Sequence, residues 1–516
     1  MTFGLTSNTA PADFDPRRDL PAGFFDYYLG LHREFTPRQQ AHARARQAAL
    51  AGAHRGELPG HLPPSAATTG DWRIELPDWC ADQRNQMTGP ADDAELVVKM
   101  LNSGAPGVMI DLEDSMANEW PNLVRGHANA VEALHGALAY DDPKRGGRVG
   151  IKPGPTVTWT RVRGLHLNQA GVVPGEPTSA SLFDLALLVR GIDPSRLKHP
   201  LAIYVPKSES ASEATWWRDV FRRLASDRGL APDFIKCMAL VESHPLAYQM
   251  EEFLHPLKDH ILGLNLGRWD YMASLIHFNL PNPAWVLPDR NTIPHDVAFF
   301  QHLRELLPDI CHKRGMLAIG GMTALFPSRT DSALNDRALA VLEQDKRNEA
   351  HALMDGAWTG HPDQNPIAVG QFPAPNQGFR RPASIDRYPD LRPTPAGVGK
   401  HTTAGSRAAA RVTIQYRFGV LSGRGASLIE GYMEDLATDR IYRLMLAQRV
   451  LHRDQVRVVD EGGKPVAHTP AFLTQLYDQE LEELLGRCED VNERERYRQA
   501  RLESEAMIVE SRPDPV

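Results

Sequence analysis

The chain has 516 residues, of which 42% are hydrophobic and 24% charged, so it can bury a large core and has the composition of an ordinary globular protein. Its 57 basic and 65 acidic residues give a formal net charge of −8, which argues against a nucleic acid or an anionic membrane as the main partner. No run of residues approaches membrane-spanning length, and the first 19 residues lack the pattern of a secretion signal.

The four cysteines, Cys80, Cys237, Cys311 and Cys488, lie far apart and show no metal-ligand spacing. This usage fits a reducing compartment, and we expect a cytoplasmic protein.

Residues 1–80 are expected to form an N-terminal helical appendage. Aromatic and aliphatic residues between Phe24 and Phe35 fall on one helical face, and a second helix follows Pro37 as far as Ala51. A segment rich in Gly and Pro, residues 56–70, separates these helices from the next domain.

Residues 81–375 are predicted to form the main domain, because short apolar runs alternate there with amphipathic stretches. Repeated βα units of this number favour a TIM-type (β/α)8 barrel in the α/β class over an open sheet. We identify seven of the eight strands that such a barrel needs. They are residues 107–112, 157–162, 201–205, 235–241, 261–264, 316–319 and 356–359.

Charged residues follow five of these runs, where a barrel would gather them at one mouth. Glu242 closes one strand and Asp270 lies just past the next, and two carboxylates there suit Mg²⁺. Either acid alone is more often a helix cap or a solvated residue, so the prediction depends on the whole set. The other charged strand ends are Asp111 to Asp114, Arg161 to His166 and Pro206 to Glu209.

A linker rich in Pro and Gly is predicted over residues 376–405, followed by a C-terminal helical domain over residues 406–516. A long helix is expected from Ala426 to His452, with an apolar stripe that includes Leu428 and Tyr432. Asp435 falls on or beside that stripe. It is either solvated at the edge of the stripe or a buried carboxylate with a function.

Several stretches together resemble the malate synthase family in its shorter, A-type form. They are Arg84-Asn-Gln-Met-Thr-Gly-Pro90, Met109-Ile-Asp-Leu-Glu-Asp114, Val162-Arg-Gly-Leu-His166, Val205-Pro-Lys-Ser-Glu209, Gly263-Leu-Asn-Leu-Gly-Arg-Trp-Asp-Tyr271, Ala318-Ile-Gly-Gly-Met322, Pro375-Asn-Gln377 and Met433-Glu-Asp435. The resemblance implies a TIM barrel with an N-terminal helical clasp and a C-terminal domain that closes over its mouth. It also implies a monomer of the glyoxylate cycle that condenses acetyl-CoA with glyoxylate and water, using Mg²⁺, to give malate and CoA.

The resemblance also implies roles for individual residues. Asp435 is similar to the catalytic base of the family and Arg163 to its catalytic arginine, while Glu242 and Asp270 match the metal ligands. Glu113 and Asp114 match a carboxylate pair near the metal.

Elementary chemistry agrees with these roles. A thioester methyl is a weak carbon acid that needs a base in a site poor in water, and an arginine is a fixed cation for the resulting enolate. Backbone N–H groups in the turn from Gly267 to Trp269 could bind the glyoxylate carboxylate, although Trp269 could equally be a core or lid aromatic. His244 is expected to be structural, since Mg²⁺ prefers oxygen ligands.

Two alternatives remain open. One is a lyase of the citrate-lyase β-subunit type that cleaves a β-hydroxyacyl-CoA such as malyl-CoA, and the other is a CoA-binding relative without activity. The C-terminal helix that is expected to carry Asp435 favours the synthase, because simpler lyases lack it in that form.

Overall fold

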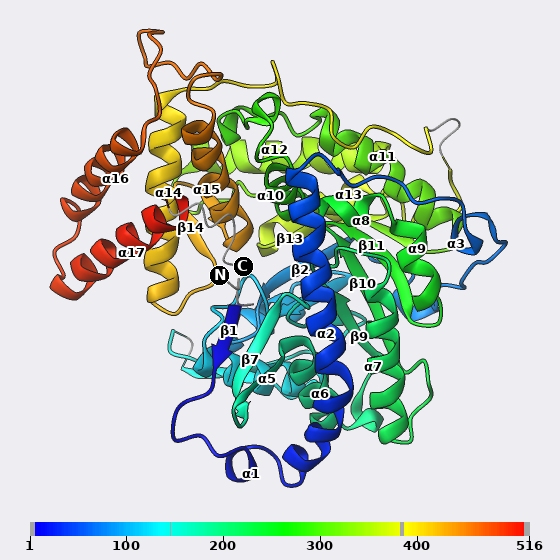
Figure 1. Cartoon of the computed structure of the whole chain (residues 1–516). Helices are drawn as coiled ribbons and strands as arrows, with labels where there is room; N and C mark the ends of the chain where they lie inside the picture. The colour runs from blue at the N-terminus through cyan, green and yellow to red at the C-terminus, as the bar shows by residue number, and fades with distance from the viewer. Residues whose placement is uncertain (1–5, 145, 382–385, 510–516) are drawn as a thin grey trace.

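Eight parallel strands close into a barrel in the computed structural model, which describes residues 6–144, 146–381 and 386–509 (Figure 1). This confirms the predicted TIM-type fold, and all seven predicted strands belong to the barrel. The eighth is β2, which the sequence analysis did not locate. The strands are β2 (Asn85–Pro90), β3 (Gly107–Asp111), β6 (Val157–Arg161), β9 (Leu201–Val205), β10 (Ile235–Val241), β11 (Ile261–Leu266), β12 (Leu317–Met322) and β13 (Gly356–Thr359).

Helices surround this barrel and cover the outer faces of its strands (Figure 1). They are α4 (Ala94–Leu101), α5 (Trp120–Leu134), α6 (Ala180–Gly191), α7 (Glu213–Asp227), α8 (His244–Ala247), α9 (Met250–Leu254), α10 (Arg268–Phe278), α11 (Ala298–Lys313), α12 (Ser332–His351) and α13 (Asn365–Gln371). None of the described helices is long and apolar enough to cross a membrane.

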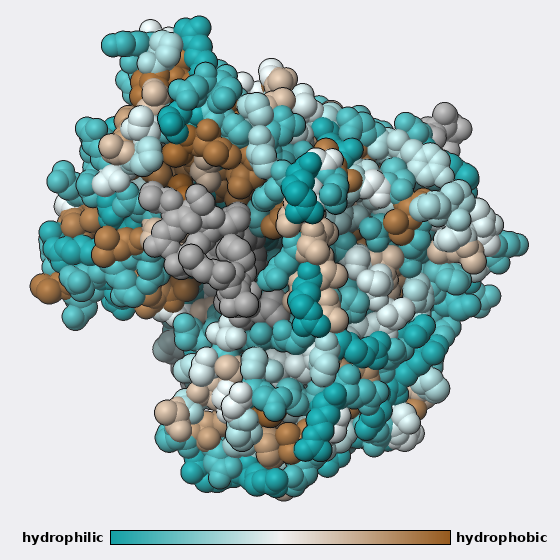
Figure 2. Space-filling view, viewed as in Figure 1, coloured by the Kyte–Doolittle hydropathy of each residue, from teal (hydrophilic) through white to brown (hydrophobic). Residues whose placement is uncertain are grey.

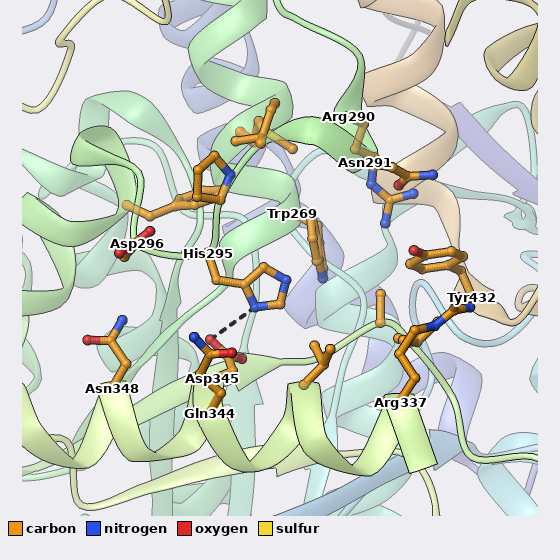
Figure 3. A pocket seen from close by; sticks show the side chains of 17 residues that line it. Trp269, Arg290, Asn291, His295, Asp296, Arg337, Gln344, Asp345, Asn348 and Tyr432 are labelled. Atoms are coloured by element: carbon orange, nitrogen blue, oxygen red, sulfur yellow. Dashed lines mark ion pairs between the residues drawn. The ribbon is translucent and has the colours of Figure 1, made fainter. Parts of the chain in front are cut away.

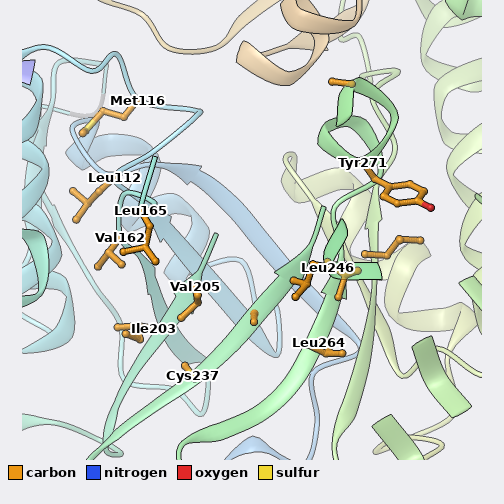
Figure 4. Packing of buried hydrophobic residues seen from close by; sticks show 14 of the residues in the cluster. Leu112, Met116, Val162, Leu165, Ile203, Val205, Cys237, Leu246, Leu264 and Tyr271 are labelled. Carbon is orange, nitrogen blue, oxygen red and sulfur yellow. The ribbon is translucent and has the colours of Figure 1, made fainter. Parts of the chain in front are cut away.

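Two apolar layers hold the barrel together. Inside it, Trp159, Tyr204, Met238 and Trp358 form a buried cluster that fills the lumen. Outside it, strand residues such as Val205 pack with the helices and loops in a larger cluster (Figure 4). Side chains alternate between the two layers along each strand, so both faces of every strand are buried.

The N-terminal region is tied to the outside of the barrel by one long helix, α2 (Phe24–His54). The predicted break at Pro37 is wrong, because the helix continues through that residue. α2 packs against α6 and α7, with Tyr28 and Leu31 fully buried (Figure 1). Three small elements precede and follow it: β1 (Thr6–Thr9), α1 (Pro16–Asp19) and α3 (Ala66–Thr69).

Two small sheets lie outside the barrel. β1 pairs in parallel with β7 (Leu167–Val173), which also pairs with β8 (Glu176–Ser179). β4 (Ala139–Asp142) and β5 (Gly147–Gly150) form a separate antiparallel pair.

The C-terminal region is helical except for one hairpin. Its elements are α14 (Thr403–Leu421), β14 (Ser427–Ile429), β15 (Tyr432–Glu434), α15 (Leu436–Leu451), α16 (Pro470–Leu485) and α17 (Val491–Val509). The helix predicted from Ala426 is therefore wrong over its first ten residues. Glu430 and Gly431 form the hairpin turn with φ of 51° and 86°, a left-handed geometry that no helix continues through.

This region lies beside the barrel and packs on α10 through α15 (Figure 1). On the face shown in Figure 2 most side chains are hydrophilic, and hydrophobic ones gather mainly around the C-terminal helices. The domain boundaries predicted at residues 80, 375 and 405 stay predictions.

Candidate active site

A cavity of about 130 Å³ lies at the carboxyl ends of the barrel strands. Its charged surroundings come from segments that directly follow different strands, as the sequence predicted. We call these side chains the cavity cluster: Glu113, Asp114, Arg161, Lys207, Glu242 and Asp270. All six are more than 90% buried. The predicted metal ligands and their predicted carboxylate neighbours are therefore brought together.

Lys207 lies among the carboxylates of the cavity cluster. Its ammonium contacts Asp114 and lies 3.0 Å from Asp270 Oδ2. Its backbone N–H donates to Glu242 Oε1 at 2.6 Å, and its φ of 46° is unusual for a residue with a side chain. The sequence analysis noted the charged segment after this strand but did not select Lys207 as a site residue. A lysine two residues beyond a fully buried strand was the available indication.

The cavity cluster has four carboxylates but two cations, and this imbalance shifts the titration of the acids. Burial raises the pKa of Glu242 to about 8, with Asp270 adding to the rise and Lys207 opposing it. Burial also raises the pKa of Glu113 well above its ordinary value. Burial alone would raise the pKa of Asp270 as well, but Lys207 and Arg440 lower it. A further cation would be stabilised here.

Glu242 and Asp270 suit a hard cation such as Mg²⁺, which accepts one or two protein carboxylates and fills its other positions with water and substrate. In the described part of the chain, no three His, Cys, Asp or Glu side chains converge on one metal position. Gly267 allows Glu242 to approach, since a Cβ on Gly267 would lie 2.6 Å from Glu242 Oε2. Both side-chain oxygens of Glu113 also lack a hydrogen-bond donor. The close approach of Glu242 and the free oxygens of Glu113 fit the predicted ion, which would take its other ligands from water and substrate.

Arg161 and Arg268 are the arginines that line the cavity, and Arg161 is the one beside the carboxylates of the cavity cluster. It is the last residue of β6, and Asp111 at the end of β3 accepts hydrogen bonds from its Nε and Nη2, both at 2.6 Å. Its Nη1 lies 3.4 Å from Glu113 Oε2. A buried pair with Asp111 thus fixes a guanidinium beside the carboxylates.

Arg163, the predicted catalytic arginine, does not line the cavity. Its guanidinium is fully buried and donates to Asp184 on α6, with Nη2 at 2.8 Å from Oδ1. Its Nη1 donates to Gln169 Oε1 at 3.0 Å. These contacts join the end of β6 to α6 and β7.

Asp435 reaches the cavity from the C-terminal region, where it caps the first turn of α15. Its side chain accepts a hydrogen bond from the Thr438 backbone N–H at 3.3 Å. Burial raises the pKa of Asp435 to about 7, and Asp114 and Asp270 add to that rise. A carboxyl group with this pKa can accept and return a proton near neutral pH.

A second cavity, of about 530 Å³, adjoins the first, and Trp269 and Ala324 line both (Figure 3). Tyr432 of β15 and Arg290 form part of its wall. Gly267 and Trp269, the predicted substrate-binding turn, line the first cavity.

Behind this turn lies a group of buried charges that we call the Arg268 cluster: Arg268, Arg304, Asp345, Lys346 and Glu349. Arg268 Nη2 lies 2.7 and 2.8 Å from the two carboxylate oxygens of Asp345. Glu349 accepts from Lys346 at 3.0 Å and from the Gly321 backbone N–H at 3.1 Å. The cluster fixes the turn to α12 and to the end of β12.

His244 has an apolar environment, which agrees with the structural role predicted for it. Its ring packs against Tyr248 and Phe278, and burial lowers the pKa of His244 to about 3.

Together, the closed parallel barrel, the carboxylate-rich cavity at its mouth and the carboxylate supplied by the C-terminal region define a barrel enzyme equipped for acid–base chemistry. Comparisons with known proteins agree. The malate synthase TIM barrel domain family matches residues 157–387, and the malate synthase C-terminal domain family matches residues 400–511.

Malate synthase A of Escherichia coli is 33% identical over 97% of this chain and 94% of its own length. Malate synthase of Streptomyces clavuligerus is 35% identical over 92% of this chain and 89% of its own length. The solved structure described as the Haloferax volcanii malate synthase pyruvate/acetyl-CoA ternary complex has a TM-score of 0.50 and 14% identity, and covers 81% of this chain and 98% of its own. That structure supports the fold.

The chain belongs to the malate synthase family, a family of acyltransferases. This membership supports the synthase prediction over the lyase and the non-catalytic alternatives.

Proposed function

We propose that this protein condenses acetyl-CoA with glyoxylate and hydrolyses the resulting malyl-CoA to malate and CoA, with Mg²⁺ as cofactor. The observation that supports it most is Asp435, a partly buried carboxylate with a pKa raised to about 7 that faces the barrel carboxylates from the C-terminal region. Membership of the malate synthase family supplies the reaction.

Asp435 is the base in this proposal. It removes a proton from the methyl group of acetyl-CoA, a step that needs a carboxylate sheltered from water. Its backbone is fixed by the cap that it forms with Thr438, whose Oγ1 accepts from the Asp435 N–H at 3.0 Å. The proton acceptor is thereby held at the start of α15.

Arg161 takes the place that the sequence analysis gave to Arg163. Its guanidinium keeps its proton and offers fixed positive charge to the enolate oxygen that forms when the methyl group loses its proton. Asp111 orients it through two short hydrogen bonds.

Glu242 and Asp270 would hold the Mg²⁺, with Glu113 and Asp114 as carboxylate neighbours. When bound, the ion supplies Lewis acidity that polarises the glyoxylate aldehyde. The backbone N–H groups of Arg268 and Trp269, in the first turn of α10, are proposed to bind the glyoxylate carboxylate, with the Trp269 ring beside it, because the Gly267 N–H already donates to the Val241 carbonyl at 3.1 Å. Orienting two substrates in this way lowers the barrier by roughly 7 to 11 kcal/mol.

The test is release of free thiol from acetyl-CoA by the purified protein, with glyoxylate and Mg²⁺, with and without EDTA. We expect release that requires both glyoxylate and metal. Asp435→Asn should lower kcat by about 10²-fold to 10⁴-fold. Asparagine also caps helices well, so α15 should persist.

Asp331→Asn is a matched control, because Asp331 caps α12 in the same way and accepts from the Leu334 N–H at 2.9 Å. It should keep wild-type activity. No thiol release by wild-type protein would contradict the proposed reaction, and full activity in Asp435→Asn would contradict the proposed base.

We also propose a monomer that works in the cytoplasm. The support is the family resemblance and the absence of disulfides among the described cysteines. Sedimentation of the purified protein and fractionation of the source cells test these two points.

A further inference from the structure

Arg290 lies between the two segments that supply the proposed base and a proposed metal ligand. It begins the short 3-10 turn Arg290–Thr292 that follows α10, and it is 5% exposed. Its Nη1 lies 2.7 Å from Glu434 Oε1 and 2.9 Å from Glu434 Oε2. Glu434 is itself buried and directly precedes Asp435. One guanidinium therefore fixes the residue next to the base.

The same guanidinium packs against the barrel. Its central carbon lies 4.6 Å from the centroid of the Trp269 ring, and Trp269 directly precedes Asp270. Figure 3 shows Arg290 between Trp269 and Tyr432. Such a stacked arginine combines cation–π attraction with hydrogen bonding, which a lysine does not reproduce.

Tyr442 on α15 completes the surroundings of Arg290. Its hydroxyl accepts from Nη1 at 3.1 Å, and its ring centroid lies 5.2 Å from the guanidinium carbon. Arg290 therefore contacts the hairpin and the helix on both sides of Asp435. Glu434 and Tyr442 belong to the C-terminal region, whereas Trp269 belongs to the barrel domain.

We propose that Arg290 is a positioning residue that sets the place of Asp435 relative to Asp270, by joining Glu434 to Trp269. The inference rests on the proposed function, since it assigns the base to Asp435. Two reacting groups supplied by different domains need such a connection, because a misplacement of 1 Å can cost about 10²-fold in rate.

A positioning residue and a residue that only stabilises the fold differ in the kinetic parameters that change when each is replaced. Loss of Arg290 should alter the transfer of a proton to Asp435, and hence kcat, while the barrel still binds glyoxylate and metal. We therefore expect kcat to fall roughly 10-fold to 100-fold in Arg290→Met and in Glu434→Gln. The KM for glyoxylate and the affinity for Mn²⁺, a spectroscopic substitute for Mg²⁺, should each stay within about twofold of wild type.

Two further variants sharpen the test. Arg290→Lys keeps the charge but not the stacking, so its kcat should lie between those of wild type and Arg290→Met. Glu430→Gln is the matched control for Glu434→Gln, because Glu430 belongs to the same hairpin but is half-exposed, with its Arg411 contact at 3.4 Å. It should behave as wild type.

Hydrogen exchange supplies a readout that is independent of catalysis. In Arg290→Met, backbone amides of residues 427–434 should exchange faster, while those of the barrel strands should not change. Faster exchange in Arg290→Met, combined with no thiol release by the wild-type protein, would support the connection through Arg290 and contradict the proposed function. Unchanged exchange together with unchanged kcat in Arg290→Met and Glu434→Gln would overturn the positioning role, as would an equal loss of kcat in Glu430→Gln.

Discussion

Two clusters of buried charge meet at the first turn of α10, since Asp270 belongs to the cavity cluster and Arg268 to the Arg268 cluster. They are equally buried but differ in charge balance. In the cavity cluster four carboxylates face one arginine and one lysine, whereas in the Arg268 cluster two carboxylates face two arginines and one lysine.

The difference appears in the titration of the acids. In the cavity cluster, burial and neighbouring carboxylates raise the pKa of Glu242 to about 8. In the Arg268 cluster, burial opposes ionisation, but Arg268 and Lys346 lower the pKa of Asp345 well below its ordinary value. The excess of carboxylates in the cavity cluster favours binding of a cation and exchange of protons. In the Arg268 cluster the cations balance the carboxylates, so the acids stay ionised and stabilise the fold.

The largest effect should follow from breaking the Arg268 cluster. Arg268→Met leaves Asp345 and Glu349 buried with one partner fewer, so we expect the free energy of unfolding to fall by about 3 to 5 kcal/mol. Urea unfolding measures this loss.

Arg347→Met is the control for that variant. Arg347 lies on the same helix as Asp345, but its side chain is 54% exposed, and its ion pair with Glu343 is on the surface. The change should stay within about 0.5 kcal/mol. If Arg268→Met proved as mild as this control, the supporting role of the Arg268 cluster would be refuted.

Arg161 and Arg163 extend the same comparison to two positions on one segment. Arg161→Lys should lower kcat/KM roughly 10²-fold to 10³-fold, because a lysine cannot both hold Asp111 through two bonds and face the cavity. Arg163→Lys should weaken the pair with Asp184, so stability should fall while kcat stays close to wild type.

Thiol release and urea unfolding, measured on both variants, separate these outcomes. If Arg163→Lys lost activity and kept its stability, the original assignment of the catalytic arginine to Arg163 would be restored.

Arg161 and Arg163 also show a limit of prediction from the sequence alone. Arg161 ends β6 and Arg163 lies two residues beyond it, and the resemblance to the family assigned the catalytic role to Arg163. The choice depends on Asp184, which comes from α6 and accepts from Nε and Nη2 of Arg163. Such a partner is distant in sequence, so no local pattern reveals it.

The barrel was more predictable than its cavity. The seven predicted strands agree with the structure to within three residues at each end, because fully buried parallel strands are short apolar runs. β2 escaped detection because Asn85 and Gln86 are polar. Their partners are tertiary, since Gln86 accepts from Trp358 Nε1 at 2.9 Å and Asn85 donates to Asn365 at 2.7 Å.

The local structure predicted around Asp435 was wrong, because Asp435 caps α15 and does not lie within a helix. The apolar spacing from Leu428 to Tyr432 fits a helix as well as it fits a hairpin followed by a helix. The left-handed turn at Glu430 and Gly431 decides between them. The raised pKa of Asp435 was also beyond the sequence, because Asp114 and Asp270 approach it only in the folded chain.

The pH dependence of kcat tests whether Asp435 titrates near neutral pH. Asp435 acts as a base only when ionised, so activity is present above its pKa and is lost as the pH falls through it. With the pKa raised to about 7, kcat should decrease about tenfold for each pH unit well below that value. Bound Mg²⁺ stabilises the carboxylate, so in the saturated enzyme the midpoint lies at or below pH 7.

The measurement is kcat at saturating substrates from pH 5 to pH 9, with circular dichroism at each pH to verify folding. A flat profile between pH 5.5 and pH 8 in folded protein would rule out a base with this pKa.

The smallest effect should come from adding metal without substrates. If the excess carboxylates of the cavity cluster bind Mg²⁺, the ion stabilises the folded state by about 1.4 kcal/mol at ten times its Kd. For a chain of this size that corresponds to a rise in Tm of about 1 to 3 °C. Asp270→Asn removes one ligand and should abolish the rise, whereas Asp259→Asn, at an exposed surface pair with Arg222, should preserve it.

Because the Arg268 cluster already has its cations, Asp345→Asn should lower Tm without changing the increment that Mg²⁺ adds. An equal increment in Asp270→Asn would mean that the ion binds elsewhere and that charge imbalance alone does not make the cavity cluster a metal site.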